Sequence, residues 1–391
     1  MPSNSLPLPI TYTQPFKALY ISLRLASIFL LIPTWTLWHA LIKKPHPSWT
    51  LKESLISRLI RWLMPINAQC GLHPLSLDKT QEVPDSKLKE TSFVWIEPPE
   101  SSIIRGAALD RDGKVKPVRV PGYVWPKGGV IGEGEGEGLV GLFFHGGGYM
   151  MGNGSEYFPE TQIAREIYKR SDVTQILSVD YRLLHESCHP GQLLDALAAY
   201  NHLILKGVSP SRILVIGACA GGHLALMLTR YLYDEKVLPM PSGLMLFSPW
   251  LDMSIDLKLL SGDTTAIRPN TDIDILATSH IPNLRFLGNQ PRELLNSPLL
   301  SANLAPPGSY KSYPRTFISI GECEAFRREC EQLHQLMIAG DVDVTLDVQP
   351  DAVHDFWGFG DLVPSVKARE ALAVNVVNWI KRHGKGKMVE P

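Results

Sequence analysis

Short apolar runs alternate with longer amphipathic segments along most of the chain. The runs have the continuity of buried strands, and they occupy residues 116–125, 139–145, 175–181, 212–215, 243–247, 315–321 and 342–348. Segments with a helical pattern lie between them, at residues 161–169, 193–205, 224–228, 325–337 and 365–381. Continuous apolar strands that alternate with helices predict an α/β fold, with a mostly parallel sheet and helices on both faces.

The N-terminal region has a different pattern, because residues 25–41 are almost wholly apolar. With the residues just before it, this stretch approaches the roughly 20 residues that a membrane-spanning helix needs. Trp35 and Trp38 lie near its end, where aromatic rings suit a membrane interface. Lys43 and Lys44 close the stretch. The pattern predicts a helix that anchors the chain in a membrane.

We place this anchoring helix at about residues 19–42, within an N-terminal region 1–50. The expected location is a membrane, with a single pass of the endoplasmic-reticulum type. Basic residues lie on both sides of the helix, so its orientation stays open. The alternative is an amphipathic or buried N-terminal helix, which Arg24 and Pro33 favour.

The rest of the chain divides into two further regions. Residues 51–104 hold a helical stretch and then a polar, proline-rich connector, and we expect them to contribute to a cap. Residues 105–391 carry the alternating strands and helices of the α/β domain. A less regular insertion at about 251–295 lies between two strands, and we expect it to form a lid.

Charge and cysteine content exclude several classes of protein. The chain has 38 basic and 39 acidic side chains and a net charge of −1, so nothing indicates a nucleic-acid partner. Five cysteines without a C-x-x-C pair indicate neither a disulfide framework nor a zinc site. We therefore expect no metal and no cofactor, and the cysteines other than Cys219 to be small buried apolar residues. The sequence leaves the oligomeric state open.

Cys219 stands in a turn of small residues. The sequence Gly217-Ala218-Cys219-Ala220-Gly221 follows a predicted strand and precedes a predicted helix. This is the arrangement of the nucleophile elbow G-x-S-x-G, with cysteine in the serine position. The two glycines give a strained turn the room to expose the nucleophile. The turn directs the thiol to a helix N-terminus, where free N–H groups favour a thiolate.

A run of three glycines after an earlier strand forms a second motif. His145 is followed by Gly146, Gly147 and Gly148. Glycine N–H groups can turn toward a developing oxyanion because no side chain is in the way. A glycine run alone would be weak evidence, but one that follows a strand and precedes an elbow predicts an oxyanion hole.

These motifs, with others further along the chain, make the sequence similar to a known family. The matching segments follow one another in order, at residues 145–148 (HGGG), 179–183 (VDYRL) with Glu186, Pro190, Asp195 and Ala196, 217–222 (GACAGG), 248–250 (SPW), 321–327 (GECEAFR) and 353–356 (VHDF). The chain resembles the hormone-sensitive-lipase-like branch of the α/β-hydrolases, which includes many esterases and deacylases, over residues 105–383. The resemblance implies the α/β-hydrolase fold and the order nucleophile, acid, histidine.

The resemblance also implies a role for individual residues. Cys219 takes the position of the nucleophile, Glu324 that of the acid and His354 that of the base. Glu322 is the competing acid, and the register of the motif favours Glu324.

The oxyanion hole implied by the resemblance is made of backbone N–H groups. They belong to Ala220 and to two of the three glycines, Gly147 and Gly148. The positions that support the two motifs are His145, Gly146, Gly217 and Gly221.

Two positions depart from the family pattern. Cys219 replaces the serine, and Ala218 replaces the acidic residue that usually precedes it. In the family that acid supports the surrounding loops, so its loss is expected to loosen them without removing the triad. A thiol ionises more readily than a hydroxyl, and beside a histidine it can exist as a thiolate.

Three functional hypotheses follow. The first is an esterase or lipase-like hydrolase, or an acyltransferase, that acts on a small lipophilic ester, thioester or lactone through Cys219, His354 and Glu324. The second is a non-covalent cyclase, isomerase or lyase of a secondary-metabolite pathway that reuses His354 and the oxyanion hole. The third is a non-catalytic binding protein. The retention of both Glu324 and His354 argues against the third, because a binding protein needs no aligned base.

Overall fold

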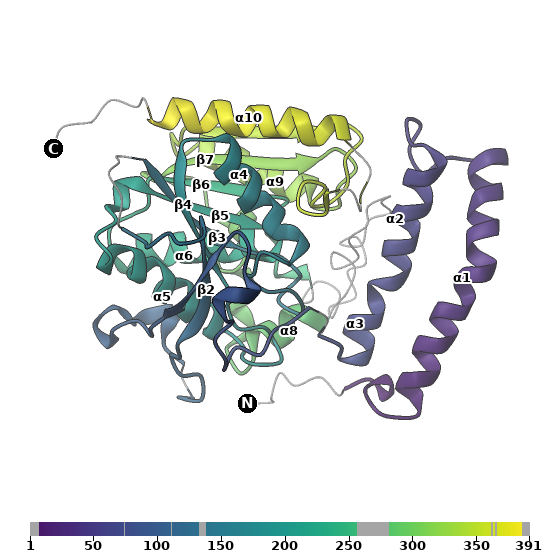
Figure 1. Ribbon diagram of the computed structural model, residues 1–391, viewed down its shortest axis with the longest axis horizontal. Helices are drawn as coiled ribbons and strands as arrows, with labels where there is room; N and C mark the ends of the chain where they lie inside the picture. Colours follow the sequence, from purple (N-terminus) through teal and green to yellow (C-terminus); the bar gives the residue numbers. More distant parts are fainter. Residues whose placement is uncertain are drawn as a thin grey trace.

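One mixed sheet forms the centre of the molecule. The computed structural model describes residues 8–73, 75–110, 112–132, 138–255, 281–360, 363 and 366–384 (Figure 1). The strands of these residues are β1 (Ser92–Ile96), β2 (Val120–Trp125), β3 (Leu139–Phe144), β4 (Val173–Val179), β5 (Ile213–Ala218), β6 (Gly243–Phe247), β7 (Arg315–Gly321) and β8 (Val344–Gln349).

The strands lie in the order β1-β2-β4-β3-β5-β6-β7-β8. The pairs β1–β2 and β2–β4 are antiparallel, and every later pair is parallel. The expected mostly parallel sheet is therefore confirmed. The chain winds outward from β3 in both directions, as in other doubly wound sheets, so that its crossover helices come to lie on both faces.

The helices that cover the sheet form two layers. On one face lie α4 (Gln162–Arg170) and α10 (Val366–Gly384), and on the other lie α5 (Gly191–Leu205), α6 (Ala220–Glu235) and α9 (Arg327–Ile338). Strand β5 shows why both faces need cover. Its Leu214 and Ile216 pack on the α4 side, whereas Ile213 and Val215 pack on the α6 side. Each such side chain stabilises the fold by about 1.5–3 kcal/mol through burial.

Three helices precede the sheet: α1 (Phe16–Leu41), α2 (Leu51–Leu63) and α3 (Pro65–Cys70). Thr50 and Glu53 begin α2 as a capping box, in which each side chain accepts a hydrogen bond from the backbone N–H of the other. In the described residues, α1 is the one helix long and apolar enough to cross a membrane. Figure 1 shows α1 outermost and α2 between α1 and the rest of the molecule.

Shorter elements complete the chain. They are α8 (Ile281–Leu287) and the 3-10 helices η1 (Ile10–Tyr12), η2 (Asp85–Lys87), η3 (Ser101–Ile103), η4 (Gly106–Ala108), η5 (Pro159–Thr161), η6 (Pro210–Arg212), η9 (Arg292–Asn296) and η10 (Ala302–Leu304).

The structure adds detail where the sequence pattern was least regular. Strand β1 lies within residues 51–104, for which helices and a connector were expected, so the sheet begins upstream of residue 105. Of the lid expected at about 251–295, residues 256–280 lie outside the described residues. Its described end contains α8, whose Phe286 packs against Tyr149 just after the glycine loop.

Candidate active site

The predicted site residues gather at the carboxyl ends of four neighbouring strands. Cys219 follows β5, Ser248 follows β6, Glu324 follows β7 and His354 follows β8. Because β5 to β8 are parallel neighbours, their carboxyl ends meet at one edge of the sheet. This topology brings together residues that are far apart in the sequence.

Close packing explains the glycines around Cys219. A Cβ atom on Gly217 would lie 2.2 Å from the carbonyl oxygen of Gly221, and one on Gly221 would lie 2.0 Å from that of Phe144. Cys219 itself has φ 49° and ψ −115°, a strained conformation for a side chain other than glycine. It directly precedes α6 and is 3% exposed. Cys219 therefore lies in a tight, strained turn between β5 and α6.

The glycine loop lies directly against the nucleophile position. A Cβ atom on Gly146 would lie 2.8 Å from the Cβ atom of Cys219. Gly147 and Gly148 follow with φ values of 94° and 61°, which glycine adopts without strain. Ala220 begins α6 next to Cys219. The residues assigned to the oxyanion hole thus lie on two segments that touch at Cys219.

Glu324 and His354 form a buried hydrogen-bonded pair. His354 Nδ1 lies 2.8 Å from Glu324 Oε1. The second oxygen, Oε2, accepts hydrogen bonds from Ser248 Oγ at 2.9 Å and from the Gly321 N–H at 2.8 Å. A carboxylate that accepts from Nδ1 leaves Nε2 as the basic nitrogen of the neutral ring. The competing acid Glu322 is exposed, and its carboxylate accepts from the Asp351 N–H instead.

Ser248 connects the nucleophile segment with the acid and the base. Its hydroxyl also accepts a hydrogen bond from the Asp355 N–H at 3.0 Å, directly after His354. The neighbouring Phe247 carbonyl accepts from the Cys219 N–H at 2.9 Å, and the Trp250 N–H donates to the Cys219 carbonyl at 3.0 Å. The sequence marked residues 248–250 only as part of the family pattern and gave Ser248 no role.

Two buried carboxyl groups join the glycine loop to the histidine loop. Glu160 accepts a hydrogen bond from the Gly146 N–H. A Cβ atom on Gly358 would lie 3.0 Å from Glu160 Cγ and 2.9 Å from Asp355 Oδ1, which shows how closely the two side chains approach. Burial and the neighbouring Glu160 carboxylate raise the pKa of Asp355 well above its usual value. Glu160 was not predicted from the sequence, because nothing in the residues around it indicates a buried acid.

Replacing Asp355 with asparagine is expected to change how stability depends on pH. The unfolded chain releases this proton near pH 4, whereas the folded chain keeps it to higher pH. Stability of the natural chain therefore falls as the pH rises from about 4 toward the raised pKa. Asparagine cannot ionise, so the free energy of unfolding of Asp355→Asn, relative to the natural chain, should increase between pH 4 and pH 8.

Urea unfolding at pH 4, 6 and 8 measures this difference. Asp341→Asn is the matched control, because Asp341 is exposed and has a similar φ, 58° against 50° for Asp355. The expectation is contradicted if the free energy of unfolding of Asp355→Asn differs from that of the natural chain by the same amount at all three pH values.

His145 is a structural histidine. Its ring stacks on that of Tyr181 with the centroids 4.4 Å apart, and the Tyr181 hydroxyl donates to the His145 carbonyl. Burial lowers the pKa of His145 to about 3, so the ring is neutral near pH 7. His145 therefore holds the start of the glycine loop in place, and the ring that faces a carboxylate is that of His354.

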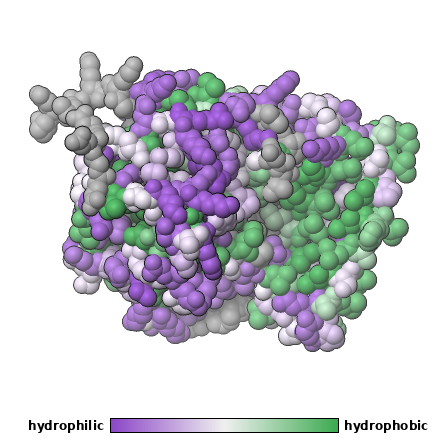
Figure 2. Space-filling model, viewed as in Figure 1, coloured by the Kyte–Doolittle hydropathy of each residue, from purple (hydrophilic) through white to green (hydrophobic). Residues whose placement is uncertain are grey.

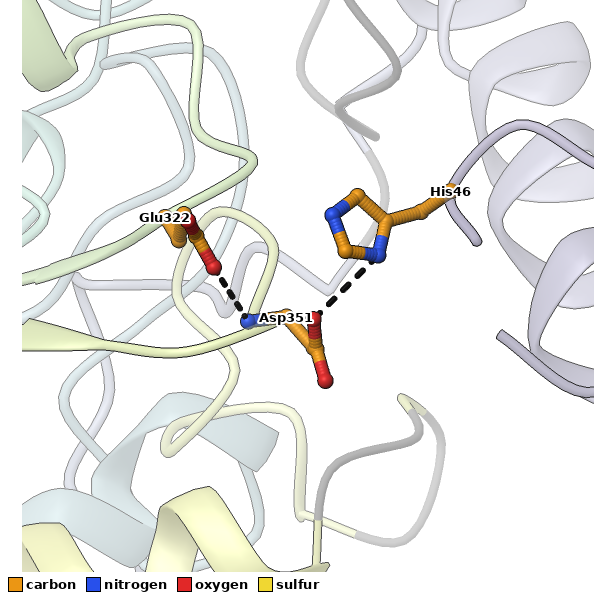
Figure 3. Close-up of side chains that lie close together, drawn as sticks. All are labelled: His46, Glu322 and Asp351. Carbon is orange, nitrogen blue, oxygen red and sulfur yellow. Dashed lines mark hydrogen bonds and ion pairs between the residues drawn. The ribbon is translucent and has the colours of Figure 1, made fainter. Parts of the chain in front are cut away.

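A group of three polar side chains lies outside this site, where the N-terminal region meets the loop before His354. His46, Asp351 and Glu322 are the described residues whose possible ligand atoms for a metal ion lie within 4.8 Å of one another. Figure 3 shows His46 and Glu322 approaching Asp351 from opposite sides. His46 Nδ1 lies 3.2 Å from Asp351 Oδ1, and Glu322 accepts from the Asp351 N–H at 3.1 Å. These contacts connect the two segments directly.

Comparison with known proteins identifies the family of this chain. The alpha/beta hydrolase fold family matches residues 141–358. An acetyl-hydrolase of Streptomyces hygroscopicus is 26% identical over 236 residues, which cover 60% of this chain and 72% of the relative. Carboxylesterase NlhH of Mycobacterium tuberculosis is 28% identical over 233 residues, which cover 57% and 68%.

A solved structure shows the same fold. It is an esterase from the bacterial hormone-sensitive lipase family, with a TM-score of 0.56 and 21% identity, and the match covers 92% of this chain and 98% of that one. The chain belongs to the α/β-hydrolase fold family. It is a hydrolase of the esterase and lipase type, so the α/β-hydrolase family expected from the sequence motifs is confirmed.

Proposed function

We propose that this chain cleaves carboxylic esters through a covalent thioester on Cys219. The observation that carries the proposal is the buried contact of 2.8 Å between His354 and Glu324, at the same edge of the sheet as Cys219. A glycine loop that touches Cys219 supplies a place for an oxyanion. The relatives are an acetyl-hydrolase and a carboxylesterase, which supports an ester as the substrate.

The first half of the reaction transfers the acyl group to sulfur. His354 Nε2 accepts the proton of the Cys219 thiol, and the thiolate attacks the ester carbonyl carbon. The N–H groups of Gly147, Gly148 and Ala220 stabilise the negative oxygen of the tetrahedral intermediate. When this intermediate collapses, the bond to the alcohol oxygen breaks, and the imidazolium returns the proton to the departing alcohol. Glu324 stabilises the imidazolium throughout.

The second half releases the acyl group. His354 accepts a proton from the incoming nucleophile, which attacks the thioester carbon, and the proton then passes to the departing Cys219 sulfur. Water as the nucleophile gives a carboxylic acid, and an alcohol gives a new ester. Hydrolysis and acyl transfer therefore share one intermediate and differ only in the acceptor that reaches it.

The N-terminal helix supports a lipophilic substrate and a membrane location. In α1 many large apolar side chains are exposed, with Phe29 at 84%, Leu30 at 76% and Leu41 at 77%. Such a surface is unfavourable in water and favourable in lipid. We include attachment to a membrane through α1 in the proposal, and with it an ester that partitions into lipid.

Intact-mass spectrometry tests the covalent step. After brief incubation with p-nitrophenyl acetate, the natural chain is expected to carry one acetyl group. Cys219→Ala should carry none, and His354→Ala should acquire it far more slowly, because the thiol then lacks its base.

Cys188→Ala is the control, since Cys188 is a partly exposed thiol outside the predicted triad. This variant should keep the adduct. An acetyl group that persists in Cys219→Ala, or no adduct with any of a series of short p-nitrophenyl esters, would sink the covalent proposal. Turnover that persists in Cys219→Ala would favour the non-covalent alternative.

A further inference from the structure

Helix α1 is apolar along most of its length, and its few charged or titratable side chains lie on one face. Its ionisable side chains Lys17, Arg24 and His39 are all partly buried on the inner face. The outer face carries the exposed apolar side chains Phe16, Leu19, Leu23, Leu25, Phe29, Leu30, Ile32, Leu37, Trp38 and Leu41. Figure 2 shows hydrophobic residues gathered on the side of the molecule where α1 and α2 lie. This is the reverse of a helix that faces water.

Helix α2 packs along the inner face of α1 and is fixed to it. Arg24 Nε donates to the Trp62 carbonyl at 3.0 Å, and its guanidinium lies 3.7 Å from the centre of the Trp62 ring. The Trp62 indole N–H donates to Ser27 Oγ at 3.1 Å. Trp62 lies at the end of α2, and the turn at residues 42–50 joins the end of α1 to the start of α2. Helix α2 therefore runs antiparallel to α1, alongside residues 24–41.

This pairing is incompatible with α1 crossing a bilayer. Helix α2 carries Lys52, Glu53, Arg58 and Arg61. If α1 stood across the membrane, α2 beside it would bring Arg58 and Arg61 to the depth of the hydrocarbon, where charged side chains are strongly disfavoured. With α1 in the plane of the membrane, its outer face enters the lipid and α2 stays on the water side. The exposed Lys43 and Lys44 at the end of α1 then lie at the level of the lipid phosphates.

The same N-terminal unit touches the chain just after the glycine loop and just before His354. His73, just after α3, donates to the Met150 carbonyl at 3.1 Å, and Asn67 of α3 lies 3.7 Å from the Met151 sulfur. Met150 and Met151 follow the glycine loop. On the other side, the Trp49 indole N–H donates to the Asp351 carbonyl at 2.9 Å, three residues before His354.

We propose that α1 lies in the plane of a lipid bilayer with its outer face among the acyl chains, and that the active site takes its ester from the adjoining membrane surface. The substrate class is an amphiphilic lipid ester. The inference rests on the proposed membrane attachment and on the proposed esterase activity, and it adds the orientation of the helix and the route of the substrate. The contacts at residues 150–151 and 351 hold the site beside this surface.

Depth-dependent fluorescence quenching tests the orientation. A fluorescent amino acid is placed in turn at Leu19, Leu30 and Leu37, which share one stripe of the outer face, and at Val374 on α10 as the control. The chain is bound to phosphatidylcholine vesicles that contain phosphatidylserine and lipids brominated at shallow or deep acyl positions. If α1 lies in the plane of the membrane, the shallow bromines quench all three α1 positions more strongly than the deep bromines do. Neither kind quenches the fluorophore at Val374.

Other outcomes overturn the inference in distinguishable ways. Deep quenching at Leu30 with shallow quenching at Leu19 and Leu37 means that α1 crosses the bilayer. No quenching at any position, or a dimer that buries α1, means that the membrane is not the partner. The acetyl adduct on Cys219 is measured without vesicles, so the esterase proposal stands or fails separately.

The route of the substrate has its own readout. Leu30→Asp combined with Leu37→Asp should lower the rate on a vesicle-embedded ester by about tenfold or more, relative to the rate on soluble p-nitrophenyl acetate. Val374→Asp removes an exposed apolar side chain of α10 instead and should leave that ratio unchanged. Thermal unfolding confirms that each variant is folded. An unchanged ratio in the α1 variant would overturn the membrane route.

Discussion

Replacing Cys219 with alanine is expected to lower kcat for p-nitrophenyl acetate by about 1,000-fold or more, the typical loss when a catalytic nucleophile is removed. The reason is that His354 and the glycine loop have no acyl acceptor without the sulfur. Steady-state kinetics under identical conditions measure the loss. KM should change far less than kcat, because the side chain reacts in the transition state and contributes little to binding.

The expectation has a matched control and a clear contradiction. Cys188→Ala removes a partly exposed thiol outside the triad and should leave kcat within about threefold, the usual range for a substitution outside the reacting groups. A Cys219→Ala variant that keeps most of its activity would show that the sulfur is not the nucleophile, and the hydrolysis would then need a general-base mechanism through His354.

Replacing Glu324 with glutamine is expected to lower kcat by about 100- to 10,000-fold, as in other triads whose acid is changed to its amide. The amide carries no charge to stabilise the imidazolium, and it can present its NH₂ group to Nδ1, which favours the wrong tautomer of His354. It also disturbs the hydrogen bonds that Oε2 accepts from Ser248 and Gly321. The pH dependence of kcat measures the accompanying shift in the titration of the base.

Glu322→Gln is the control that separates the two candidate acids. Glu322 is exposed and bonded to the Asp351 N–H, so its amide should keep kcat within about threefold. The reverse result, a large loss in Glu322→Gln and a small one in Glu324→Gln, would show that the acid had been assigned to the wrong residue.

The order of strands and helices in the α/β region could be predicted because its strands are buried on both faces. Strands β6 and β7, for example, coincide with their apolar runs. Strand β1 escaped prediction for the opposite reason. Its five residues lie at the edge of the sheet and are mostly half-buried, in a region rich in proline. The pairing of β1 with β2 depends on tertiary contacts that no local pattern reveals.

The motifs along the chain predicted Cys219, Glu324 and His354 as site residues. The residues that hold the site in place, Ser248 and Glu160, could not be predicted from motifs. Ser248 acts through hydrogen bonds to two segments that are distant in the sequence. Glu160 is a buried acid among ordinary helix-start residues, and only the folded chain shows that it bonds to Gly146. The same holds for α1 and α2. Both helical stretches were evident in the sequence, but the packing of the charged α2 along α1 was not.

The contacts of the N-terminal unit with residues 150–151 and 351 have a practical consequence for producing the protein in soluble form. Deleting the first 73 residues would remove the apolar helix, but it would also remove contacts that hold the chain just after the glycine loop and just before His354. Exchanging outer-face leucines of α1 for polar residues preserves α2, α3 and the Trp49 contact. Solubility is thus better sought by redesigning one face of a helix than by shortening the chain.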